Sequence, residues 1–141
     1  MRRGPLIPAE VPRWRSRSEL FDQAVLDAYA PIAEKWRSRL THLDIAVDMV
    51  PRMRIRPHTI FPEEIIADGQ VPLARLIPAG VDRAGKPTRP CIVVFRRAIE
   101  KRANDAEELS QLLSSLMTQL VAVYLSVFPT DIDPDFQEWE F

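Results

Sequence analysis

The chain contains little glycine, cysteine or histidine. Of its 141 residues, four are glycine and one is cysteine, two are histidine, and 13 are proline. No GxGxxG or GxxxxGK motif occurs, which argues against the phosphate-binding loops of common nucleotide-binding proteins. The single Cys91 excludes an internal disulfide and also CxxC-type zinc and redox sites. The only histidines are His42 and His58, so imidazole is absent from residues 59–141.

Long apolar runs are absent as well. No run approaches the roughly 18 residues that a membrane-spanning helix needs, so we expect no membrane association of that kind. The apolar stretch 4–8 that follows the basic N-terminus is too short for the core of a signal peptide, which predicts a cytoplasmic protein. Hydrophobic residues make up 46% and charged residues 28% of the chain. This composition is typical of a globular protein, and the length predicts one domain.

Charge is unevenly distributed although the net charge is only −1. Residues 104–141 carry eight acidic residues and no lysine or arginine, whereas both preceding parts of the chain have an excess of basic residues. One interpretation is that an acidic final helix and tail lie against a basic body. The other is a basic arm for an anionic partner. No aromatic residues interleave with the arginines in a binding motif, so the sequence disfavours nucleic acid as that partner.

Two helices are predicted by apolar residues at helical spacing. The first covers 17–39 and begins with a capping box in which Ser16 is the N-cap and Glu19 reaches back. Pro31 lies inside it and should kink or split it. The second follows Asn104 as N-cap and continues to 128, because its apolar stripe is wide and Pro129 ends it.

Three strands are predicted from apolar alternation or continuous apolar runs: 43–47, 73–78 and 91–95. The third is the strongest, and the prolines that flank the second suggest a place at the edge of a sheet. Residues 51–71 are rich in proline and are predicted as a loop with one short turn at 63–67. Residues 82–87 are predicted as a turn, and 96–102 as a basic connection or short helix.

This order of elements predicts an α+β fold, with a small mixed sheet of three to four short strands and two main helices packed on it. We expect a flexible, basic, proline-rich arm at 1–15, a single domain at 16–128 and an acidic, aromatic tail at 129–141. The tail contains Phe136, Trp139 and Phe141 among its acids. It either docks on a partner or folds back onto the basic body.

The stretch 91–99, followed by 104–109 and a long apolar helix, resembles the C-terminal half of the small bacterial zincin-like metallopeptidase family. The resemblance covers roughly residues 17–128, is strongest over 73–128 and consists of a pattern of apolar residues and turns. It implies a minimal zincin-like fold. In family members with an intact site, the last helix carries an HExxH motif, in which two histidines hold Zn²⁺ and the glutamate acts as general base.

The positions equivalent to that motif are Thr118, Gln119 and Ala122, taken from the aromatic position that Tyr124 occupies. Alanine has no donor atom, glutamine cannot accept a proton as a carboxylate does, and a lone threonine hydroxyl is a poor zinc ligand. The resemblance implies zinc, but these residues do not support it. We therefore expect a protein of this family without catalytic residues or metal, acting as a binding or regulatory module for an unidentified protein partner.

The alternative is a hydrolase with a non-standard metal site made of His42, His58 and a tail aspartate, Asp131 or Asp133. Zinc ligands are normally anchored at short spacing on a rigid element, which these are not, so two surface histidines are the simpler interpretation. The alternating Asp131, Asp133 and Asp135 lack the glycine and glutamate of an EF-hand loop and fit a solvated tail.

Two further features have simpler explanations than a site. Cys91 begins an apolar strand and has no histidine near it in sequence, so we expect an inert thiol. Arg52, Arg54 and Arg56 alternate, which would place three cations on one side of an extended segment. Solvation or pairing with the acidic tail explains them more simply than a phosphate site.

Overall fold

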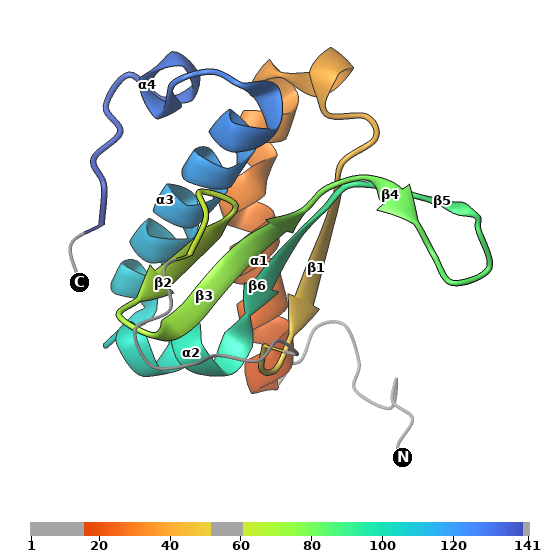
Figure 1. Cartoon of the computed structure of the whole chain (residues 1–141). Coiled ribbons are helices and arrows are strands. Elements are labelled where there is room, and N and C mark those ends of the chain that lie inside the picture. The colour runs from red at the N-terminus through yellow and green to blue at the C-terminus, as the bar shows by residue number, and fades with distance from the viewer. Residues whose placement is uncertain (1–15, 52–60, 140–141) are drawn as a thin grey trace, which may run out of the picture.

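A four-stranded mixed sheet with helices on one face forms the α+β fold predicted from the sequence (Figure 1). The computed structural model describes residues 16–51 and 61–139. The elements are α1 Arg17–Lys35, the short 3₁₀-helix η1 Arg37–Arg39, β1 Asp44–Asp48, β2 Ile65–Asp68, β3 Val71–Ile77, β4 Gly80–Val81, β5 Pro87–Thr88, β6 Cys91–Phe95, α2 Arg96–Arg102, α3 Ala106–Leu125 and α4 Pro129–Ile132. The predicted arm at 1–15, the arginines at 52–56 and His58 lie outside the described residues.

The strands are arranged in the order β1-β6-β3-β2. β6 pairs in parallel with β1 and antiparallel with β3, which in turn forms an antiparallel hairpin with β2. β6 is the continuous apolar run identified above, and its inner position explains that composition because both of its faces are covered. β1 lies at an edge and is half-buried, as its alternating sequence predicts.

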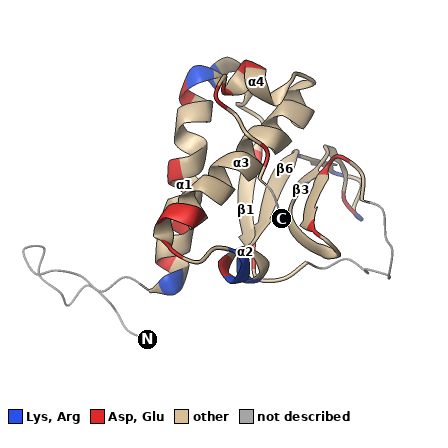
Figure 2. Ribbon diagram, turned by 90° about the vertical axis from the view of Figure 1, so that its left-hand side faces the viewer, with Lys and Arg blue, Asp and Glu red and all other residues tan. Residues whose placement is uncertain are grey.

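Helices α1 and α3 lie side by side on one face of the sheet (Figures 1 and 2). α1 contributes Phe21, Val25, Ala28 and Ile32 to the core at spacings of four, three and four residues. Its N-cap is Ser16, as predicted, and the Glu19 amide donates to the Ser16 hydroxyl at 3.2 Å. The Glu19 carboxylate accepts from the same hydroxyl at 3.1 Å.

Pro31 does not split α1, which was one of the two effects predicted for it. The helix is continuous to Lys35, and the chain then tightens into η1, so the single helix expected over 17–39 is two elements. Burial of the residues on either side of the proline, Ala28 and Ile32, holds the helix on α3 although proline lacks the amide that would reach the Asp27 carbonyl.

Residues 65–68 form a strand where a loop was predicted. The register Asp68↔Val71 leaves a two-residue turn of Gly69 and Gln70, and Gly69 has a φ of 62°. Glycine at the first position of a two-residue turn is a hairpin signal because such turns need positive φ there. The strand before this turn has only four residues, and the prolines upstream of it favour the prediction of a loop.

β3 lies inside the sheet, so its predicted edge position is wrong. Proline normally marks an edge because it cannot donate a ladder hydrogen bond. Pro72, however, precedes the stretch 74–77 that pairs with β6, and it lies opposite Ala67, where the β2–β3 register shifts. Its missing amide therefore removes no bond to β6, and Pro78 follows the end of the strand.

α3 starts one residue later than predicted, with Asp105 as its N-cap. The Glu108 amide donates to the Asp105 carboxylate at 2.8 Å. Asn104 instead donates from its side chain to the Glu108 carboxylate at 3.0 Å. The helix ends at Leu125, before the predicted end at 128, because Ser126 adopts a left-handed conformation with a φ of 58°.

The segment after α3 returns along that helix (Figure 1). α4 buries Ile132, which is 5% exposed, and Trp139 packs against the same core cluster. Where β3 ends and β6 begins, β4 and β5 form a small hairpin that projects from the body (Figure 1), and its turn is held by amides of Ala84 and Lys86 donating to Asp82. Among the described residues, no helix combines the length and apolar character needed to cross a membrane.

Candidate functional site

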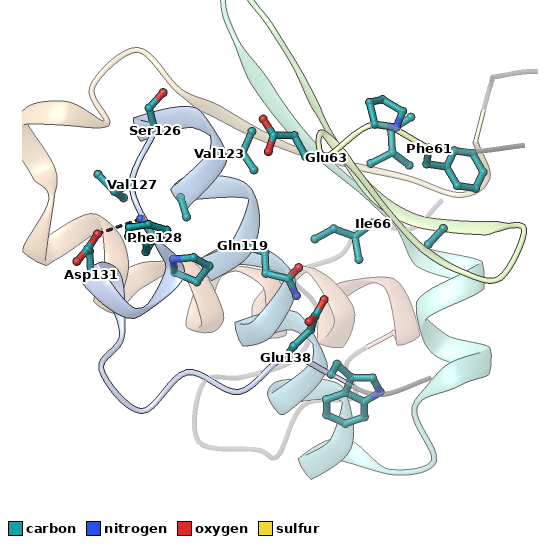
Figure 3. A pocket seen from close by; sticks show the side chains of 16 residues that line it. Phe61, Glu63, Ile66, Gln119, Val123, Ser126, Val127, Phe128, Asp131 and Glu138 are labelled. Carbon is teal, nitrogen blue, oxygen red and sulfur yellow. Dashed lines mark hydrogen bonds between the residues drawn. The ribbon is translucent and has the colours of Figure 1, made fainter.

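A cleft of about 900 Å³ lies between α3, the β2 edge and the returning C-terminal segment (Figure 3). Its volume is within the range of about 300–1,000 Å³ that is typical of ligand pockets. Four parts of the chain line it: 61–67, the α3 face at 119–123, the turn 126–129, and residues 131, 138 and 139. Segments far apart in sequence therefore meet at one open surface.

The α3 wall of the cleft includes two of the three positions equivalent to the metallopeptidase motif. Gln119 and Ala122 line the cleft together with Val123. The Gln119 amide nitrogen donates to the Ser115 hydroxyl at 3.3 Å, so the side chain is held along its own helix. Thr118 is 4% exposed and does not line this cleft. It lines a separate hollow, together with Ile32 of α1 and Ile132 of α4.

The walls are largely apolar. Phe61 and Ile66 come from the β2 side, and Val127 and Phe128 come from the turn that follows α3. Phe128 is 75% exposed although it is a large aromatic residue. An exposed aromatic side chain beside a hollow with apolar walls is an arrangement typical of binding surfaces.

Three carboxylates enter the cleft from different segments. Glu63 approaches from the turn before β2, Asp131 from α4, and Glu138 from the C-terminal segment, where it faces Gln119 (Figure 3). The Asp131 carboxylate accepts a hydrogen bond from the Phe128 amide at 2.9 Å. Asp131 thereby fixes the turn that presents the phenyl ring.

The outer edge of β2, which has no neighbouring strand in the described sheet, faces the cleft. The Leu76 amide donates to the Glu64 carbonyl at 2.7 Å, so residue 64 directs its carbonyl toward β3. In an antiparallel ladder this direction alternates along the strand. The carbonyl of Ile65 therefore points to the outer edge. Beyond the register shift, Asp68 pairs with Val71 across the two-residue turn, so the amide and carbonyl of the preceding Ala67 also point outward. Both Ile65 and Ala67 line the cleft.

The residues of the cleft do not fit a zinc ion. Ala122 offers no ligand atom, and Gln119 offers only a neutral amide oxygen, which is not among the thiolate, imidazole and carboxylate ligands of zinc sites. Within 16–51 and 61–139, no group of three or more histidine, cysteine, aspartate or glutamate side chains is placed to hold a metal ion. His42 is exposed in the turn before β1, whereas His58 lies outside the described residues, so the alternative site remains an untested prediction.

Two side chains outside the cleft have a pKa above the ordinary value of their group. Burial raises the pKa of the Cys91 thiol, and the carboxylates of Asp44 and Asp48 on the neighbouring strand β1 raise it further. A raised pKa reduces the thiolate fraction at neutral pH, which disfavours a nucleophilic role. Burial, and secondarily Tyr124, raises the pKa of Tyr29.

Comparison with known proteins identifies no relative: no family model matches the chain, and no curated protein matches it. The site is therefore defined by its own geometry. The sequence pointed to α3, but it did not reveal the β2 edge, Phe128 or Glu138 as walls of the cleft. Gly69 at the first position of the turn could have revealed the hairpin, whereas the return of the C-terminal segment has no local signal.

Proposed function

We propose that this chain is a catalytically inactive, zincin-like binding module of the cytoplasm that holds an extended peptide segment of a partner protein in the α3–β2 cleft. The observation that supports this most is the open cleft at Gln119 and Ala122. Gln119, Ala122 and Val123 of the helix that would carry zinc ligands in a peptidase line this cleft, although Ala122 is only 2% exposed, and none of the three can hold the metal.

The β2 edge supplies the second part of the argument. Proteins commonly bind extended peptides by adding a strand to an exposed sheet edge, where main-chain groups give affinity and side-chain pockets give specificity. The backbone of Ala67 is directed to that edge, and apolar side chains flank it on both sides. The cleft can therefore contact a peptide through its main chain and its side chains together.

The experiment is a fluorescence-anisotropy titration with a labelled heptapeptide of alternating valine and serine with a central norleucine. Ala67→Pro removes the outward amide, and proline is tolerated where a strand amide faces outward from a sheet edge. Phe128→Ala removes the exposed ring. Each change is expected to weaken binding by about tenfold, a loss of roughly 1.4 kcal/mol.

Val81→Ala is the matched control, because Val81 is 72% exposed on β4 and does not line the cleft. The affinity of the Val81→Ala variant for the peptide should equal that of the unsubstituted protein. Mass spectrometry of the same peptide after prolonged incubation should show it uncut, and elemental analysis should show no stoichiometric zinc. Absence of binding by the parent would refute the binding function, and peptide cleavage would refute the inactive state.

A further inference from the structure

The charged residues in the described lining of the cleft are all acidic. Its described lining includes Glu63, Asp131 and Glu138 and contains no lysine, arginine or histidine. The described ion pairs join Arg89 to Asp44, Arg96 to Glu100 and Arg102 to Asp68, all away from this lining. The described lining is therefore anionic, and no cation within it neutralises its charge.

The carboxylates are positioned around the space rather than gathered on one wall. Glu138 faces Gln119 from the C-terminal segment, and Glu63 reaches in from the opposite side, above Val123 (Figure 3). Apolar walls surround them, including Ile66 and Phe128. A cleft lined by one sign of charge with walls of low dielectric constant concentrates its field on the occupant.

We infer that the occupant of this cleft is a peptide segment in which a lysine or arginine is flanked by apolar residues. This inference rests on the proposed function, since it names the chemistry of the segment that the β2 edge would hold. The cationic side chain would lie between Glu63 and Glu138, and the flanking apolar side chains would contact Phe128 and Ile66. An acidic residue at the same position would be repelled by both carboxylates.

A peptide fits these features better than a small cation does. A small cation would use the carboxylates but neither the outward backbone of Ala67 nor the exposed ring of Phe128. The cleft also includes the apolar side chains of Val123 and Val127, which contribute nothing to binding an isolated charge. Only an extended chain with both apolar and basic side chains uses every wall.

The test compares three labelled heptapeptides of alternating valine and serine that differ only at the central residue, which is lysine, norleucine or glutamate. We expect the lysine peptide to bind about tenfold more tightly than the norleucine peptide at low salt, and the glutamate peptide to bind most weakly. The advantage of lysine should shrink as salt is raised, because screening weakens exposed charge interactions.

Glu63→Gln combined with Glu138→Gln should abolish the preference for lysine while leaving the affinity for norleucine unchanged. The control is Glu34→Gln combined with Glu107→Gln, which removes the same number of charges from exposed positions outside the cleft. It should retain the preference. Equal binding of all three peptides by the parent would overturn the charge inference and leave the binding function intact. Binding of none would overturn both, and tighter binding of glutamate would overturn the inference directly.

Discussion

Two adjacent residues at the start of α3 make different hydrogen bonds to Glu108. The Asp105 carboxylate accepts from the Glu108 amide, whereas the Asn104 side chain donates to the Glu108 carboxylate. Replacing an N-cap residue with alanine costs about 1 kcal/mol of stability because an amide in the first turn of the helix loses its hydrogen-bond acceptor. We expect Asp105→Ala to lower the free energy of unfolding by about that amount in urea denaturation. Asn104→Ala should cost less than about 0.5 kcal/mol, since it removes only an exposed contact. A larger loss of stability for Asn104→Ala than for Asp105→Ala would mean that Asn104 is the N-cap.

The Cys91 thiol offers a second test at the level of single residues. Because burial and the carboxylates of Asp44 and Asp48 raise its pKa, less thiolate is present at a given pH than in a free cysteine. Alkylation by iodoacetamide should therefore be slower in the native protein than in urea, and its pH midpoint should lie above that of free cysteine. Asp48→Asn should shift the midpoint downward, and Asp82→Asn, in the projecting hairpin, should not. A native midpoint below that of free cysteine would contradict this account.

At the scale of elements, the faces of α3 decide which residues could hold a metal. Gln119 and Val123 are four residues apart and both line the cleft, whereas Thr118 is buried toward α1 and α4. Two histidines at that spacing on one helix face can share a metal ion. We expect Gln119→His with Val123→His to gain stability with Zn²⁺, about 2.7 kcal/mol at a metal concentration 100 times the dissociation constant.

Thr118→His with Ala122→His is the comparison, and it follows the equivalence that the family resemblance implies. Overpacking at the buried Thr118 should cost about 1–3 kcal/mol without metal. Zn²⁺ should give this variant no stabilisation in thermal unfolding, because the two side chains do not face one open space. Stabilisation of this pair and not of the other would show that the equivalence assigned from the sequence is the correct one.

Elements with a strong, uninterrupted pattern could be predicted from the sequence, and short ones that depend on tertiary pairing could not. β6 and α3 follow directly from their apolar patterns, as does the capped start of α1 at Ser16. β2 has only four residues, and its pairing with β3 depends on a hairpin that brings it to the sheet. Pro72 suggested an edge because local reasoning cannot reveal that the ladder to β6 begins two residues later. The cleft could be predicted only in part for the same reason. Its α3 wall follows from a periodic sequence pattern, whereas its other walls depend on contacts between segments far apart in the chain.

At the scale of the whole molecule, several acids of the C-terminal part serve local structure. Carboxylates of Asp105, Asp131 and Asp133 each accept a hydrogen bond from a backbone amide two or three residues away. The described ion pairs, in contrast, join residues that precede position 104. No described ion pair therefore supports the interpretation in which an acidic final segment pairs with a basic body. Of the remaining described acids in this part of the chain, Glu138 lines the cleft.

The C-terminal segment belongs to the folded body, and this can be measured. Ile132 is 5% exposed and packs in the same core cluster as Leu116 and Phe21, although it follows the end of α3. We expect Ile132→Ala to lower the free energy of unfolding by about 2–5 kcal/mol, because it removes buried methyl groups and leaves a cavity. Leu26→Ala is the control, since Leu26 is 58% exposed on α1 and should change stability by less than about 0.5 kcal/mol. Urea denaturation followed by circular dichroism gives both values. Equal, small effects would mean that the segment detaches in solution, and the cleft would then lose the wall that carries Glu138 and Trp139.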